Sequence, residues 1–418
     1  MTKSKHFPFV ISLFGGILVW VFIFILFPAK IVSPFAKESF LFIFLSYVSL
    51  ILGYISFPIA KTHNKGFAII SKRFIYIIII TTLMTYIVRY IDLFIFRNVS
   101  FSNDVWQNRA LLAETKPNFI FIVCAVLKQL YFVPIIFVLK NKVLDKKLLT
   151  ISFLLFLLPF IEGFIRESRN AFFTPVILLL ITLLYFKKIS FNRKHIVIII
   201  SAVTILFTIA TSIIMQREAS ETDGNYSSLT TDFFLNDFLA PSPKLFEVIH
   251  STKNIKAKKM MVSGFQIAQY YVHGVFEFDN LVKYYQKTPM KHQYGKFTFS
   301  IINKFTNKYE FTDSNLKEVQ LMNPRGSTFI TFFGGLYVDF GWFGLIVIFF
   351  YGCFQKRIMN KVTIGNNSYL PLFLFFLFCN FFMLTFNFLR GMGTYTLIVC
   401  FAIVFSLSLW NKLALKNK

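Results

Sequence analysis

The chain has 418 residues, of which 56% are hydrophobic and 15% are charged, and 58 of them are Phe. A soluble protein keeps roughly 25% charged residues, so this composition excludes an ordinary soluble fold. The 44 Lys and Arg residues exceed the 19 Asp and Glu residues and give a net charge of +25. In so apolar a chain, this excess of positive charge indicates contact with the bilayer surface and not binding of nucleic acid. We expect an all-α, polytopic membrane protein that binds no nucleic acid.

Apolar stretches of roughly 17 to 25 residues are long enough to cross the hydrocarbon core of a bilayer as helices. The first stretch follows Lys3 and Lys5 and is predicted to be a retained anchor, because its apolar run is too long for a signal peptide. All four Cys residues lie within apolar runs, so neither a disulfide framework nor a zinc site is expected. We predict ten transmembrane helices, near residues 9–27, 39–60, 74–95, 118–139, 148–164, 171–186, 195–215, 327–354, 369–388 and 393–410.

Lys and Arg residues are distributed unevenly over the short connections between these stretches. If the N-terminus is cytoplasmic, the inside segments hold 20 Lys and Arg residues and the short outside segments hold 8. Because positive residues favour the cytoplasmic side, both termini are predicted to be cytoplasmic. The chain then divides into residues 1–215 with helices one to seven, a large outward loop at 216–326, and residues 327–418 with helices eight to ten.

Within the outward loop, the segment GFQIAQYYVHGVFEFDNLVKYY at residues 264–285 repeats apolar residues at helical spacing. This pattern predicts a helix that either lies along the membrane surface or packs within a small core of the loop itself. His273 falls on this helix and His292 follows it. Each His is either an ordinary surface residue or a catalytic group, and no His or carboxylate pair recurs at metal-ligand spacing.

Arg residues are placed differently from Lys residues. Only three of the eleven Arg residues lie on the predicted cytoplasmic side, and the others lie outside or in the outer half of the membrane. A guanidinium binds phosphate or carboxylate oxygens through two parallel hydrogen bonds, so this bias predicts an anionic ligand at the outer boundary. The alternative is that these residues extend to headgroups or pair with Asp92, Glu162, Glu167 and Glu218. The candidates at helix ends are Arg89, Arg166, Arg169, Arg217, Arg325 and Arg390.

Two charged residues fall inside predicted spans, namely Lys128 and Asp339. An isolated charge there costs roughly 2.5 to 3.5 kcal/mol on insertion scales, so each needs a partner or a wet cavity. Their similar depth permits a salt bridge between them. A ligand-binding or catalytic role for Asp339 is the alternative.

The segments RESRNAFFTPVILLL and NPRGSTFITFFGGLYVDFGWFG, together with the helices and the large second-half loop, resemble the Wzy-type polymerases of O-antigen and capsule repeat units. The loop segments YYVHGVFEFDNLVKYY and YGKFTFSIINKF are also similar to that family. The resemblance covers most of the chain. The positions that match the T, Y, DFG and G pattern of the family are Thr328, Tyr337, Asp339, Phe340, Gly341 and Gly344.

The resemblance implies a GT-C-like, metal-independent glycosyltransferase without a cofactor in the bacterial cytoplasmic (inner) membrane, its active site facing the periplasm or exterior. Its substrates are glycans linked to undecaprenyl diphosphate, and its product is O-antigen for lipopolysaccharide or a capsular polysaccharide. Membrane lipids, a chain-length regulator and a flippase of the same pathway are the implied partners. The implied catalytic residues are Arg166, Arg169 and Arg325. The candidate substrate-binding residues are Arg217, Arg390, Arg89, His273 and Asp339.

Two other functions stay open from sequence alone. An O-antigen ligase performs the same transfer onto a lipid A core, and its sequence pattern does not separate it from a polymerase. A flippase or transporter of lipid-linked sugars also needs outward cations. The 111-residue outer loop and the lack of two matching halves disfavour a transporter.

Overall fold

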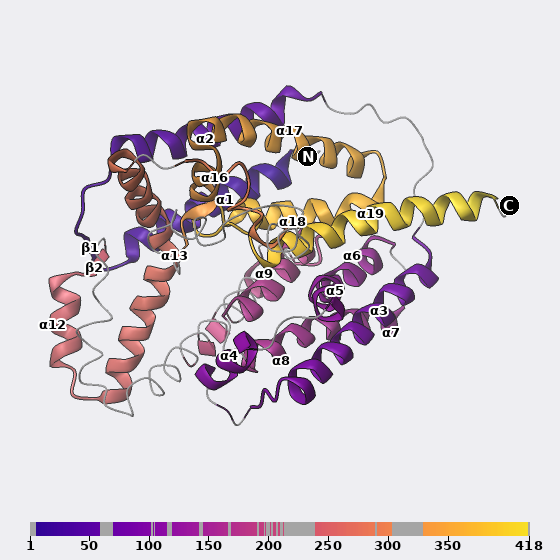
Figure 1. The fold of residues 1–418 in the computed structure, drawn as a ribbon, viewed down its shortest axis with the longest axis horizontal. Helices are drawn as coiled ribbons and strands as arrows, with labels where there is room; N and C mark the ends of the chain where they lie inside the picture. The colour runs from indigo at the N-terminus through magenta and orange to yellow at the C-terminus, as the bar shows by residue number, and fades with distance from the viewer. Residues whose placement is uncertain are drawn as a thin grey trace. The chain divides into compact units, whose positions relative to one another are not determined.

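A computed structural model describes residues 6–58, 70–101, 103, 105–114, 119–141, 145–165, 169–189, 239–288, 291–302 and 329–416, with short stretches between 192 and 212. These residues are predominantly helical (Figure 1). Seven helical segments among them are long and apolar enough to cross a membrane: Phe7–Leu26, Lys37–Ser56, Lys72–Phe96, Phe119–Lys140, Lys146–Ile165, Thr331–Thr363 and Met392–Asn411.

These segments confirm a multi-pass, all-α membrane protein. Two shorter apolar helices, Ala171–Tyr185 and Asn367–Phe381, coincide with two further predicted stretches. The remaining stretch, 195–215, falls mostly outside the described residues. The total of ten spans therefore stays a prediction, as does the GT-C-like arrangement.

The chain forms two compact units that alternate along the sequence. The first comprises residues 1–59, 222–357 and 379–394, and the second comprises residues 60–221, 358–378 and 395–418. The large outer segment thus folds with the first two helices of the chain, although residues 60–221 of the second unit separate them in the sequence.

The first unit consists of helices and one small antiparallel sheet. In the sheet, Ala29 lies opposite Pro241 and Ile31 opposite Leu239, so the end of the first helix is tied to the outer segment. The elements are α1 (Phe7–Leu26), β1 (Ala29–Ile31), α2 (Lys37–Ser56), β2 (Leu239–Pro241), α12 (Pro243–Ser251), α13 (Ile255–Lys287), α16 (Thr331–Phe340), η4 (Gly341–Phe343) and α17 (Gly344–Thr363), whose last residues belong to the second unit.

Helix α13 is enclosed by other helices over its C-terminal half, and its position along the membrane surface stays a prediction. Every residue from 272 to 279 is buried, because the helix packs against α1, α2 and α16. Phe276 contacts the ring of Phe24, and Phe278 contacts the ring of Phe42. The amphipathic pattern predicted one exposed face, but three neighbouring helices cover the whole circumference.

Two glycines allow α2 and α17 to approach closely. A Cβ atom on Gly53 would clash with the carbonyl oxygen of Phe349, and one on Gly352 would clash with that of Leu50. Small residues at such crossings let helix backbones meet and gain van der Waals contact within a membrane. A larger side chain at either position would separate the two helices.

The second unit holds the remaining spans, two of which change helix type near their middle. Pro134 follows the 3₁₀ segment η2, and Pro159 follows the 3₁₀ segment η3. Proline removes a backbone donor and clashes with the preceding turn, which accounts for both interruptions. The elements are α3 (Lys72–Ile91), η1 (Asp92–Phe96), α4 (Val105–Glu114), α5 (Phe119–Leu127), η2 (Lys128–Phe132), α6 (Val133–Lys140), α7 (Lys146–Leu154), η3 (Leu155–Leu157), α8 (Leu158–Ile165), α9 (Arg169–Tyr185), η5 (Asn367–Tyr369), α18 (Leu370–Phe381) and α19 (Met392–Lys416). The last residues of α18 and the first residues of α19 belong to the first unit.

Candidate functional site

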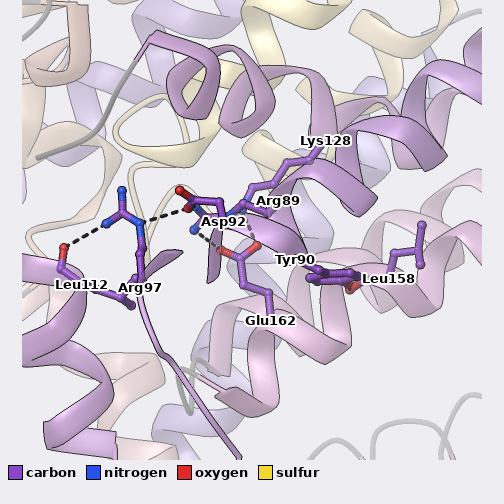
Figure 2. Close-up of polar contacts among 8 residues, drawn as sticks. All are labelled: Arg89, Tyr90, Asp92, Arg97, Leu112, Lys128, Leu158 and Glu162. Atoms are coloured by element: carbon purple, nitrogen blue, oxygen red, sulfur yellow. Dashed lines mark hydrogen bonds and ion pairs between the residues drawn. The ribbon is translucent and has the colours of Figure 1, made fainter. Parts of the chain in front are cut away.

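A cluster of five charged side chains lies within the second unit (Figure 2). Four of them are at most 6% exposed, and Asp92 is slightly more accessible. They come from four elements, α3, η1, η2 and α8, and from the loop after η1. The members of this charge cluster are Arg89, Asp92, Arg97, Lys128 and Glu162.

Glu162 is the centre of the charge cluster because its carboxylate binds two cations. Its Oε2 atom lies 2.5 Å from Lys128 Nζ, and its Oε1 atom lies 2.9 Å from Arg89 Nη2. Asp92 also binds two cations: its Oδ2 atom lies 3.4 Å from Arg89 Nη1 and 3.0 Å from Arg97 Nε. The guanidinium of Arg89 therefore bridges the two acids.

Local irregularities in the helices bring these side chains together. Helix α3 continues after Ile91 into a π-helical turn, η1, which carries Asp92 round to face Arg97. Lys128 begins the 3₁₀ segment η2. Deviations of this kind are frequent at functional sites because they redirect individual side chains.

Phe121 supplies an aromatic surface between two of the cations. The guanidinium carbon of Arg89 lies 3.8 Å from the centroid of its ring, and that of Arg97 lies 4.1 Å from it. The ring face attracts cations, most strongly where water is excluded. The aromatic contact therefore helps to hold two guanidinium groups close to each other despite their mutual repulsion.

The charge cluster lies in the predicted outer half of the membrane. At about 1.5 Å per residue, Arg89 is roughly 10 Å from the end of its span at Phe96, Glu162 is roughly 5 Å from Ile165, and Lys128 is roughly 14 Å from Phe119. The contacts also require the spans ending at Phe96 and Ile165 to run in the same direction, as the predicted topology has them. Charges at this depth are expensive and usually mark a functional site.

These contacts bear on two sequence-based alternatives. Arg89 pairs with Asp92 and Glu162, as the pairing interpretation expects, and its role toward an anionic ligand stays a prediction. The predicted salt bridge between Lys128 and Asp339 is wrong, because Lys128 binds Glu162 instead. The Nε donor of Arg89 is buried and makes no hydrogen bond within the described part of the chain.

Asp339 lies in the first unit, at the end of α16, and binds backbone rather than a cation. Its Oδ1 atom accepts a hydrogen bond from the N–H of Phe297, and its Oδ2 atom accepts one from the N–H of Thr298, both at 2.9 Å. The Asp339 carbonyl accepts another from the N–H of Tyr294, at 2.8 Å. Asp339 is fully buried and holds the outer segment at 291–302 against α16. We infer a positioning role for it.

Arg390 lies near Asp339, in the same unit. Its guanidinium carbon stacks 3.8 Å from the centroid of the Phe297 ring, and its side chain is half-buried. Burial lowers the pKa of Arg390, and the nearby Asp339 carboxylate opposes that effect. The structure thus brings together two predicted site residues, Arg390 and Asp339, around Phe297.

His273 and an acid that the sequence analysis did not single out, Glu277, lie one turn apart on α13. His273 Nδ1 is 3.1 Å from the carbonyl oxygen of Gln269 in its own helix, and its ring contacts Tyr270. Burial raises the pKa of Glu277 from 4.5 to about 7. A carboxyl group that titrates near neutral pH is suited to proton transfer. The signal in the sequence that could have identified Glu277 is a charged residue within an otherwise apolar turn of the predicted helix.

Glu277 gives a pH-dependent prediction. Its folded pKa exceeds its unfolded value, so its contribution to stability is complete below about pH 4.5 and is lost as the pH rises through about 7. Glu277→Gln should therefore stabilise the protein at pH 8, by up to about 3 kcal/mol, and make little difference near pH 4.5. Thermal unfolding in detergent at both pH values measures this. Glu247→Gln, at an exposed position on α12, is the control. An equal effect of Glu277→Gln at both pH values would contradict the assignment.

The other predicted site residues are placed only in part. Arg169 is the first residue of α9, in the second unit. Arg166, Arg217 and Arg325 lie outside the described residues. The prediction that all six arginines share one anionic site therefore stays a prediction.

The chain was also compared with known proteins. No family model, no curated protein and no solved structure matches it.

Proposed function

We propose that the protein is an oligosaccharide repeat-unit polymerase of the bacterial cytoplasmic membrane, acting at its outer face. It transfers a growing glycan from undecaprenyl diphosphate to the sugar of an incoming lipid-linked repeat unit and so builds O-antigen or capsular polysaccharide. The observation that carries this proposal is Arg89, a buried arginine in the predicted outer half of the membrane whose Nε donor has no partner among the described residues. The sequence resemblance supplies the reaction class.

The chemistry requires cations where Arg89 lies. The bond from the anomeric carbon to the diphosphate oxygen breaks, the acceptor hydroxyl oxygen bonds to that carbon, and the hydroxyl proton passes to a base. Negative charge develops on the departing diphosphate, and positioned donors in a water-poor site stabilise it. In this proposal Arg89 and Arg390 bind substrate, whereas Arg166, Arg169 and Arg325 stabilise the leaving group. No metal ion is needed in this proposal because guanidinium groups supply the neutralising charge.

The proposal is tested with Arg89→Lys, which retains the positive charge facing Glu162 and Asp92 but removes the planar fork. Losing the charge-assisted hydrogen bond from Nε, worth about 1.5 to 3 kcal/mol, should slow chain extension roughly ten- to a hundredfold. The measurement is a glycan ladder gel of a strain that lacks the gene and carries the variant. Arg169→Lys and Arg325→Lys are expected to shorten the ladder in the same way.

Arg73→Lys is the matched control, because Arg73 is exposed at the opposite end of the same helix. Membrane levels of every variant are measured alongside the ladder. Wild-type ladders from Arg89→Lys, Arg169→Lys and Arg325→Lys at normal levels would refute the proposal. Accumulation of single repeat units indicates a polymerase, whereas long chains retained on the lipid carrier would indicate a ligase.

A further inference from the structure

The hairpin of α12 and the start of α13, residues 243–261, is strongly basic. It contains five lysines, Lys244, Lys253, Lys256, Lys258 and Lys259, against one acid, Glu247. Lys253 and Lys256 are exposed, and Lys258 is half-buried. The hairpin lies on the predicted outer side of the membrane. The preference of positive residues for the cytoplasmic side therefore does not explain its excess of lysines, and another cause is needed.

The same hairpin exposes large apolar side chains. Ile255 is 66% exposed, Met260 63%, Val248 51% and Phe246 41%. The opposite face of α12 is different: Ile249 is fully buried and Leu245 packs against the same core. Lysines interspersed with exposed apolar residues on a short helical element are typical of a segment that lies in the headgroup region of a bilayer.

The hairpin is fixed at the end of a membrane span. Sheet β1–β2 ties the residues just before the hairpin to the chain just after α1, and the rings of Phe27 and Phe265 stack at 4.6 Å. Figure 1 shows α12 and the first half of α13 side by side, running across the direction of α1 rather than along it. Since α1 is a membrane span, the hairpin lies at the boundary where that span leaves the hydrocarbon core.

An apolar groove opens between α1 and this hairpin. Its volume is about 260 Å³, and its walls include Leu26 at the end of α1, Phe27 directly after it and Leu245 from α12. Met261, Phe265 and Ala268 line it from α13 at helical spacing. Lys258 continues that stripe by one turn, because residues three apart lie on the same face of a helix. A half-buried cation thus stands next to an apolar groove.

We propose that the groove and the hairpin lysines bind one anionic phospholipid of the outer leaflet, independently of the proposed glycosyl transfer. The headgroup phosphate lies against Lys253, Lys256 and Lys258, and part of one acyl chain occupies the groove. A groove of about 260 Å³ with apolar walls suits a short apolar segment such as part of an acyl chain. The exposed apolar side chains enter the surrounding bilayer.

The test uses the full-length protein in a non-ionic detergent, titrated with dioleoyl phosphatidylglycerol or dioleoyl phosphatidylcholine. Native mass spectrometry measures bound lipid, and thermal unfolding measures the shift in Tm. We expect the anionic lipid to bind and raise the Tm, and the zwitterionic lipid with the same chains to do so far less. Lys253→Gln, Lys256→Gln and Lys258→Gln together should weaken binding of the anionic lipid roughly tenfold to a hundredfold.

Two variants separate the headgroup from the chain and from a general charge effect. Ala268→Phe fills the groove and should abolish stoichiometric binding although the lysines remain. Lys146→Gln, Lys147→Gln and Lys188→Gln together remove the same charge from exposed positions on the predicted cytoplasmic side and should leave binding unchanged. Equal binding of both lipids, or native binding by the hairpin triple variant or by Ala268→Phe, would overturn the proposal. So would protection by undecaprenyl phosphate with none from phosphatidylglycerol.

Discussion

Glu162→Gln should destabilise the protein by about 3 to 5 kcal/mol, because it removes the negative charge at the centre of a buried cluster. The carboxylate binds both Lys128 and Arg89, so its replacement by an amide leaves two buried cations short of their counter-ion. Adding Lys128→Met should recover most of the loss, since Arg89 retains Asp92 and the amide oxygen of the new side chain would still accept its hydrogen bond. Thermal unfolding and membrane yield of both variants measure the effect.

Asp145→Asn provides a matched control with the same acid-to-amide change. Asp145 pairs with Lys72 at 3.7 Å in a solvent-accessible position, and its side chain accepts a hydrogen bond from the N–H of Leu148 at the start of α7. Asn retains that cap, and exposed ion pairs contribute at most about 1 kcal/mol. If Glu162→Gln were no more destabilising than Asp145→Asn, the charge cluster would not be a tightly coupled network.

Asp339→Leu should also destabilise the protein strongly, by about 2 to 6 kcal/mol. It removes the acceptor from two buried backbone N–H groups, of Phe297 and Thr298, and an unsatisfied buried donor costs about 1 to 3 kcal/mol. Asp339→Asn should be milder because the amide oxygen still accepts one of these bonds. Thermal unfolding measures both, and hydrogen exchange at residues 297 and 298 should accelerate most in Asp339→Leu.

Combining Asp339→Leu with Lys128→Met distinguishes the binding of Asp339 to backbone N–H groups from a salt bridge between Asp339 and Lys128. Because Lys128 and Asp339 bind different partners, the two destabilisations should add, to within about 0.3 to 0.5 kcal/mol. A salt bridge between them would instead make the double variant more stable than the sum of its parts. Such a rescue would contradict the assignment of Asp339 to the backbone of 297 and 298.

Span positions were predictable from sequence because their signal is local. The length of an apolar run is a property of one segment, and the described helices Phe7–Leu26, Lys37–Ser56 and Lys72–Phe96 begin and end within a few residues of the predicted stretches. Burial of α13 was not predictable in this way. Its periodic pattern indicates one buried face, but the packing of α1, α2 and α16 around residues 272–279 depends on contacts between distant parts of the chain.

The partners of buried charges were predictable only as a set of possibilities. Glu162 and Asp339 are both acids within predicted spans, and hydropathy gives no means of choosing which one pairs with Lys128. Asp339 in fact accepts hydrogen bonds from backbone N–H groups, and because every residue except proline carries such a donor, the residue types at 297 and 298 do not reveal it. For Arg89, both observed partners, Asp92 and Glu162, were among the four acids that the sequence offered to the arginines as a set.

The burial of α13 also constrains the order in which the protein is made. Asp279 accepts a hydrogen bond at 2.8 Å from the N–H of Ala36, at the start of α2, and these two residues are 243 positions apart. At about 5 to 20 residues per second, a ribosome needs roughly 12 to 49 s to synthesise the intervening chain. The first two spans therefore enter the bilayer long before the helix that covers them exists. During that interval their inward faces remain accessible to lipid and to the insertion machinery.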